Sequence, residues 1–173
     1  MHQDDVLTVL KKGLNTKVWG QRFYKQAAAR TRAVDGQRVF ESLVEEEGKH
    51  ITILRQEYAK LTGKELSLAE TLALADSVSP TEIFPQAQAA DHLIPPETTD
   101  EQALEMAMDF ERRGFELYDA QAKKATSPAE RRMWEFLAKA ENLHFTFLQE
   151  THEYLTTNGT WYFDEQEFPI FYD

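Results

Sequence analysis

The sequence contains no cysteine. Disulfide bonds, thiolate metal sites and iron–sulfur clusters are therefore excluded, and any bound metal ion must be held by oxygen and nitrogen ligands. Glycine and proline are also scarce, with 7 and 6 among 173 residues. Because these residues are the ones that interrupt helices, their scarcity favours long, continuous helical segments.

Basic residues are in the minority, since 19 Lys and Arg face 30 Asp and Glu and leave a formal net charge of -11. Such a surface repels nucleic acid and anionic membranes. No stretch approaches the length of a membrane-spanning apolar segment, and the N-terminal residues lack the pattern of a secretory signal. We therefore expect a soluble, cytoplasmic protein whose partners are cations, with no nucleic acid and no membrane among them.

Apolar residues recur with helical spacing along four stretches. They predict helices over residues 5–31, 35–62, 100–125 and 128–157. Thr98, Thr99 or Asp100 can cap the third helix, and Ser127 followed by Pro128 can begin the fourth. Short turns join the first helix to the second and the third to the fourth, so each pair should form an antiparallel hairpin.

A long connection separates the two predicted hairpins. It covers residues 63–99, with a short helix expected over 67–76 and then Pro80, Pro85, Pro95 and Pro96. A connection of this length can run along a bundle. We therefore expect an all-α four-helix bundle with one crossover over residues 1–157, followed by a tail over 158–173.

The two hairpins match each other when the sequence is shifted by 94 residues, without a gap. An ungapped match through both hairpins predicts an internal duplication and a bundle with approximate twofold symmetry. The matching pairs are Gly20 and Gly114, Tyr24 and Tyr118, Glu41 and Glu135, Leu43 and Leu137, Glu47 and Glu141, His50 and His144, and Leu54 and Leu148.

The helix faces expected to point into the bundle are apolar apart from a few polar residues, most of them ionisable. The second and fourth helices each place a Glu-x-x-His pair there, the third places a Glu, and the first places a Lys at the equivalent position. Three carboxylates, two imidazoles and one ammonium would then fall in about one layer. They are Lys17, Glu47, His50, Glu111, Glu141 and His144.

Buried charges cost several kcal/mol per ion unless they are paired. Iron, manganese or zinc would supply the partner. Two Glu-x-x-His helices and two helices that each give a Glu form the ligand pattern of carboxylate di-iron bundles, here with Lys17 in place of one Glu. The alternative is a buried salt-bridge layer without metal.

Other ionisable residues lack this context. His2, His92 and His152 are expected to be surface or ordinary packing residues. Glu45 and Glu46, beside Glu47, are expected to form a solvated face of the second helix.

These motifs resemble the rubrerythrin-like branch of the ferritin-like superfamily over residues 7–157. In that family each hairpin reads as Glu, then Gly three residues later, an aromatic-Tyr pair, and Glu-x-x-His about thirty residues on. The second hairpin matches closely, and the first departs from the pattern at Lys17. The matching residues are Glu111, Gly114, Leu117-Tyr118, Glu141 and His144, and then Gly20, Phe23-Tyr24, Glu47 and His50.

The resemblance implies a ferritin-like bundle with a non-haem di-iron site that reduces peroxide or oxidises ferrous iron. Glu47 and Glu141 would bridge two metals, Glu111 with His144 would complete one position, and His50 would serve the other. Tyr24 and Tyr118 would lie just behind the ligands as candidate catalytic residues, or would simply belong to the core. These roles are carried over from the family at the positions of this sequence that match its motif.

Lys17 reduces the expected metal content. Three Glu and one Lys leave a formal charge of -2, which one divalent cation neutralises, so a single metal on the Glu111 and His144 side is expected. Two metals remain open if Lys17 turns aside and water fills the vacancy.

Three functions follow: an iron oxidoreductase acting on hydrogen peroxide, oxygen or ferrous iron with a separate electron donor, a redox-silent metal-binding or iron-handling protein, and a structural bundle with a relic site.

The tail from residue 158 is rich in aromatic residues, which are costly to leave in water. We expect the tail to cap the bundle or an oligomer interface, with a homodimer as the assembly. Its aromatic residues are Trp161, Tyr162, Phe163, Phe168, Phe171 and Tyr172.

Overall fold

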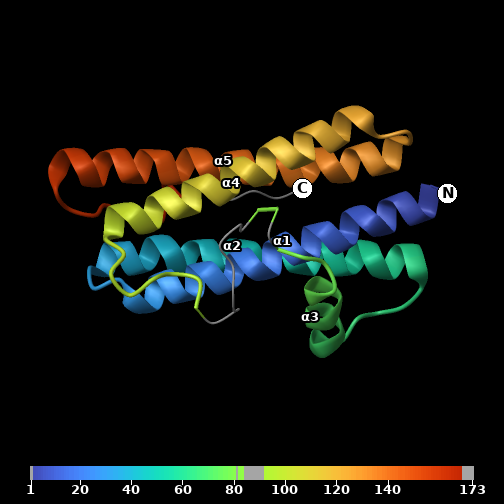
Figure 1. Ribbon diagram of the computed structural model, residues 1–173, viewed down its shortest axis with the longest axis horizontal. Coiled ribbons are helices and arrows are strands. Elements are labelled where there is room, and N and C mark those ends of the chain that lie inside the picture. Colours follow the sequence, from blue (N-terminus) through green and yellow to red (C-terminus); the bar gives the residue numbers. More distant parts are fainter. Residues whose placement is uncertain (1, 81, 84–91, 169–173) are drawn as a thin grey trace.

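A computed structural model describes residues 2–80, 82–83 and 92–168, and within these residues the chain forms five helices and no strand. Helices α1 (His2–Arg30) and α2 (Val34–Thr62) form one hairpin, and α4 (Asp100–Lys124) and α5 (Pro128–Asn158) form the other (Figure 1). The short helix α3 (Leu68–Asp76) packs on α1, outside the four long helices. The predicted all-α bundle of two hairpins with a long crossover is confirmed.

The helix ends follow from local sequence. The Thr99 side chain accepts a hydrogen bond from the backbone of Gln102, whose side chain accepts one from the Thr99 backbone, which makes a capping box at the start of α4. At the start of α5 the Ser127 side chain accepts a hydrogen bond from the backbone of Glu130, and proline occupies the first turn. Helices α2 and α5 each end at a glycine in the left-handed conformation, Gly63 at φ 74° and Gly159 at φ 73°.

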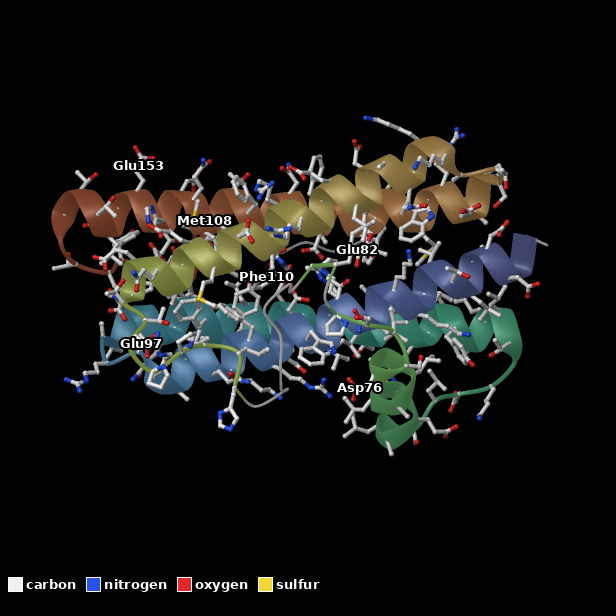
Figure 2. The ribbon with its side chains drawn as sticks, viewed as in Figure 1. Asp76, Glu82, Glu97, Met108, Phe110 and Glu153 are labelled. Carbon is white, nitrogen blue, oxygen red and sulfur yellow. The ribbon has the colours of Figure 1, made fainter. Side chains whose placement is uncertain are left out.

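The crossover is attached to the bundle through α1. The Asn15 side chain donates hydrogen bonds of 2.9 Å to the backbone oxygens of Ala75 and Val78, just where α3 ends. Arg22 forms a two-pronged ion pair with Asp76, which Figure 2 labels at the lower edge of the molecule, with N–O distances of 2.9 and 3.1 Å. The first hairpin therefore carries the connection to the second.

The core runs along the seam between the two hairpins. Phe110 of α4 points toward α1 (Figure 2), where its ring centroid lies 5.0 Å from that of Phe23 and 5.4 Å from that of Tyr24. Buried leucines from all four long helices fill the rest of the seam: Leu10, Leu14, Leu43, Leu54, Leu104, Leu137 and Leu148.

Among the described residues, no helix is long and apolar enough to cross a bilayer.

The described part of the tail packs on the bundle. Trp161 is only 9% exposed. Its ring lies 5.7 Å from that of Phe40, and its Nε1 donates a 3.0 Å hydrogen bond to the side chain of Asp100 at the start of α4. The homodimer stays a prediction. Pro85 of the crossover and Phe171 and Tyr172 of the tail lie outside the described residues.

A substitution at Gly36, in the first turn of α2, tests the packing of Trp161 on the bundle. A Cβ at this position would lie 2.8 and 2.9 Å from ring atoms of Trp161 and 2.6 Å from Thr31 Cγ2. We expect Gly36→Ala to lower the free energy of unfolding by about 1–3 kcal/mol through overpacking.

Gly48 on the same helix is the control, since its Cβ would meet only the flexible end of Gln21 at 3.2 Å. Gly48→Ala should be neutral or should stabilise by up to about 1 kcal/mol. Urea denaturation of both variants measures the difference, and equal stabilities would contradict the packing of Trp161 against Gly36.

Candidate metal centre

Seven ionisable side chains meet in one buried layer between the two hairpins, here called the polar layer. Helix α1 contributes one of them, α2 three, α4 one and α5 two, and none is more than 2% exposed. Helical spacing of three and four residues along apolar seams brings them to the same height. They are Lys17, Glu46, Glu47, His50, Glu111, Glu141 and His144.

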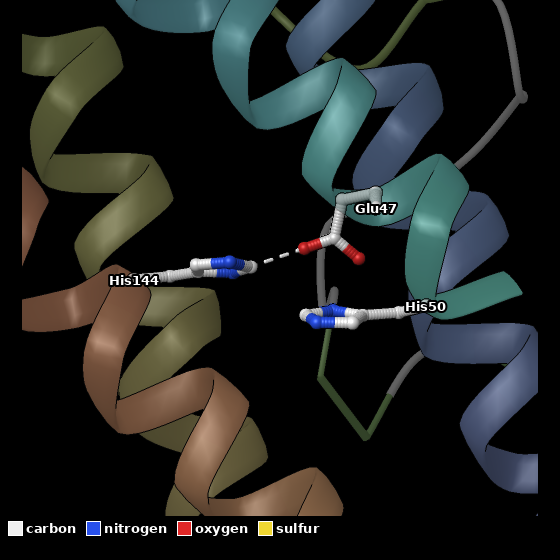
Figure 3. Close-up of side chains that lie close together, drawn as sticks. All are labelled: Glu47, His50 and His144. Atoms are coloured by element: carbon white, nitrogen blue, oxygen red, sulfur yellow. Dashed lines mark ion pairs between the residues drawn. The ribbon is translucent and has the colours of Figure 1, made fainter. Parts of the chain in front are cut away.

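Three members of the polar layer could hold a metal ion. One ligand atom from each of Glu47, His50 and His144 lies within 4.8 Å of the others, and all three side chains are buried. Figure 3 shows Glu47 and His50 extending from α2 toward His144 of α5. His144 Nδ1 lies 3.1 Å from Glu47 Oε1, and the two imidazole rings stack with centroids 5.6 Å apart.

Glu111 lies beside this cluster. Its Oε1 is 3.4 Å from His144 Nδ1 and accepts a 2.5 Å hydrogen bond from the Tyr24 hydroxyl. Glu111 Oε2 and both ring nitrogens of His144 have no hydrogen-bond partner of good geometry among the described residues. Buried polar atoms without partners are costly, and a cation bound by Glu111 Oε2 and one of the two ring nitrogens would remove part of this cost.

Lys17 occupies the other side of the polar layer. Its Nζ lies 2.8 Å from Glu141 Oε1 and 3.5 Å from Glu47 Oε2. Burial alone would lower the pKa of Lys17, but the charges of Glu141 and Glu47, with a contribution from Glu111, raise it above its ordinary value. Lys17 therefore stays charged, and its ammonium joins the two carboxylates that the duplication places opposite each other.

The remaining charges are strongly coupled. Burial would raise the pKa of Glu111, but contacts with Glu141 and the charge of His144 outweigh burial and hold the pKa at about 2. Burial and the neighbouring Glu111 raise the pKa of Glu141 well above its usual range. Burial would lower the pKa of His144, but Glu111 and the other nearby carboxylates raise it. A metal ion that binds Glu141 or His144 would therefore compete with protons for these groups.

The two tyrosines differ in their partners. Tyr24 donates to Glu111, whereas the Tyr118 hydroxyl forms a hydrogen bond with Thr16 Oγ1. The duplication explains the difference, because the residue equivalent to Glu111 is Lys17, which is a donor and cannot accept a proton from Tyr118. Of the two, it is Tyr24 whose hydroxyl forms a hydrogen bond with one of the carboxylates expected to be ligands.

The expectation that Glu46 lies on a solvated face was wrong. Its side chain is 1% exposed, and its Oε1 lies 3.9 Å from Nε2 of both His50 and His144. The sequence did contain a signal, because residue 46 is three positions after buried Leu43 and four before His50, as a seam residue should be. Glu45 is exposed, as expected.

The histidines expected outside the site are also accounted for. His92 is exposed, and His152 is 23% exposed and lies 3.1 Å from Glu105. The side chain of His2 lies outside the described residues.

Comparison with known proteins gives one family. The family model described as Rubrerythrin matches residues 9–152, which include most of both hairpins and the whole polar layer. No curated protein and no solved structure matched the chain. The family match confirms the resemblance seen in the sequence motifs and covers well over half of the chain. The chain belongs to the rubrerythrin family.

Proposed function

We propose that the polar layer binds iron and that the protein is a non-haem oxidoreductase acting on peroxide, oxygen or ferrous iron. The observation that carries this proposal is the convergence of ligand atoms from Glu47, His50 and His144 within 4.8 Å in a buried site of a rubrerythrin-family chain. Carboxylate and imidazole donors suit iron, manganese and zinc. Iron would supply the electron transfer to or from the oxidant.

We further propose one tightly held metal per chain. Lys17 Nζ lies 3.5 Å from Glu47 Oε2, whereas Glu47 Oε1 lies 3.1 Å from His144 Nδ1. One Glu47 oxygen thus faces an ammonium and the other faces the imidazoles, which supports a single metal position on the histidine side. The position expected from sequence was completed by Glu111 and His144, whereas this one includes His50 and has Glu111 beside it.

Tyr24 is the group best placed to move a proton at this position. Its hydroxyl donates to Glu111 Oε1, which is also 3.4 Å from His144 Nδ1. Reduction of one H2O2 to two waters consumes two electrons and two protons. The chain has no cysteine for an iron–sulfur relay, so the electrons are proposed to come from ferrous iron or from a separate donor.

The Lys17 ion pairs favour a second candidate, a redox-silent protein that binds one metal ion. Peroxide turnover separates the two. Protein loaded with Fe(II) and supplied with a reductant should consume H2O2 in many turnovers, and protein loaded with Zn(II) should not. If both forms consume H2O2 only at the background rate, the protein is not an oxidoreductase, although it can still bind a metal.

Metal binding should stabilise the fold. Because a ligand that binds only the native state adds about 2.7 kcal/mol at 100 times its Kd, Fe(II), Mn(II) or Zn(II) should raise the Tm of stripped protein by about 5–10 °C. His144→Ala should abolish this increase. His152→Ala, which removes a partly exposed histidine outside the layer, is the control and should retain it.

The stripped protein itself should remain strongly helical by circular dichroism, because the leucine seams do not depend on the metal. If none of the three metals changes the Tm of the native protein, the proposed metal site is wrong.

Lys17 provides the test of stoichiometry. Lys17→Glu changes the charge of the layer by -2 and adds a carboxylate, so metal content by elemental analysis should rise from about one toward two per chain, since each divalent ion needs such compensation.

Lys17→Met is the matched control, since it removes the ammonium without adding a ligand. The Met variant should stay at one metal, and its stripped form should lose about 3–5 kcal/mol of stability because Glu141 is left unpaired. Two metals at full occupancy in the unmodified protein would contradict the role given to Lys17.

A further inference from the structure

We propose that Glu46 is a positioning residue that orients both imidazoles of the polar layer for metal binding by accepting hydrogen bonds from their Nε2 atoms. This inference rests on the proposed metal binding and goes beyond it, since Glu46 is not one of the residues expected as ligands. It requires that Glu46 lie behind the imidazoles, on the side away from the metal.

The position of Glu46 relative to His144 meets this requirement. Nδ1 of His144 faces two carboxylates, with Glu47 Oε1 at 3.1 Å and Glu111 Oε1 at 3.4 Å. Nε2, on the opposite edge of the ring, faces Glu46 Oε1 at 3.9 Å. A histidine that binds a metal through one nitrogen generally donates its other N–H to a carboxylate, carbonyl or water. The geometry assigns Nδ1 to the metal and Nε2 to Glu46.

Glu46 can serve both rings. Its Oε1 is 3.9 Å from Nε2 of His50, one turn further along α2, and 3.9 Å from Nε2 of His144 on α5. The two rings are stacked at an interplanar angle of 25°, and the two distances place the Nε2 atoms of both rings at the same carboxylate oxygen. Closing each distance to a hydrogen bond requires a movement of about 1 Å, and a carboxylate oxygen has two lone pairs, so Oε1 can accept from both rings.

The internal duplication shows that Glu46 adds a carboxylate that the second hairpin does not have. Its counterpart in the second hairpin is Ala140, which is fully buried, just as the counterpart of Glu111 is Lys17. Relative to the second hairpin, the first hairpin therefore lacks a carboxylate at residue 17 and has an additional one at residue 46. With Glu46 included, four carboxylates and one ammonium leave the layer at a formal charge of -3 when the imidazoles are neutral, so Glu46 increases the demand for a cation.

Zinc binding by the Glu46→Gln variant tests the proposal. Glu46→Gln keeps the size of the side chain and removes its charge, and Glu45→Gln, at the exposed neighbouring position, is the matched control. Competition with a chelator should show Zn(II) affinity about 10–100-fold weaker in Glu46→Gln, with the number of zinc ions per chain unchanged. Glu45→Gln should bind as the native protein does, and Glu46→Asp should recover part of the loss.

Two further measurements exclude a purely structural role. The stripped Glu46→Gln protein should melt close to the temperature of the stripped native protein, because glutamine keeps the size of the side chain and an oxygen that accepts hydrogen bonds. In the zinc-loaded native protein, 15N NMR of the imidazoles should find Nε2 protonated and Nδ1 bound to zinc.

Three results would overturn the inference: native affinity in Glu46→Gln, a lost zinc ion in that variant, or zinc bound at Nε2 of either ring. Absence of zinc binding by the native protein would instead remove the proposed metal centre, and Glu46 with it.

Discussion

The buried ammonium of Lys17 is the constraint on which the rest of the site depends. It lies 2.8 Å from Glu141 and 3.5 Å from Glu47 in the middle of an apolar bundle. An unpaired charge in that position costs several kcal/mol. The ion pairs therefore hold the two carboxylates near the Lys17 ammonium. Their orientation in turn decides which oxygens face the imidazoles, and so divides the polar layer into an ion-paired side and a side open to a cation.

The fold could be read from the sequence almost completely. Three sequence features predicted it: helical periodicity, the caps at Thr99 and Ser127, and the 94-residue repeat. The first two depend only on neighbouring residues, and the third appears when the sequence is compared with itself. Each corresponds to a feature of the structure. The attachment of the crossover was not predictable in the same way. Asn15 reaches backbone oxygens more than fifty residues away, and no spacing within one helix encodes such a contact.

The sequence predicted which side chains of the four long helices meet in the polar layer, but not how these side chains pair with one another. Spacing on apolar seams was sufficient to bring Glu47, His50 and His144 together, because residues at the same height on neighbouring helices must meet. Spacing could not tell which carboxylate would pair with Lys17, or that Tyr118 would turn to Thr16 while Tyr24 kept Glu111. These pairings depend on which hydrogen-bond donors and acceptors lie closest together inside the bundle. The spacing of residues along a helix does not describe those distances.

The exchange of carboxylates between the two hairpins also bears on how the sequence can have changed. A Glu codon becomes a Lys codon, and an Ala codon becomes a Glu codon, by a single base substitution. If the ancestral repeat carried the residues now at 111 and 140, the first hairpin reached Lys17 and Glu46 by two such steps. The first step alone would have removed a carboxylate and added a positive charge, and the second restores part of the negative charge. Residues 17 and 46 should therefore vary together among relatives, as a pair that drifts jointly while the Glu-x-x-His motifs stay fixed.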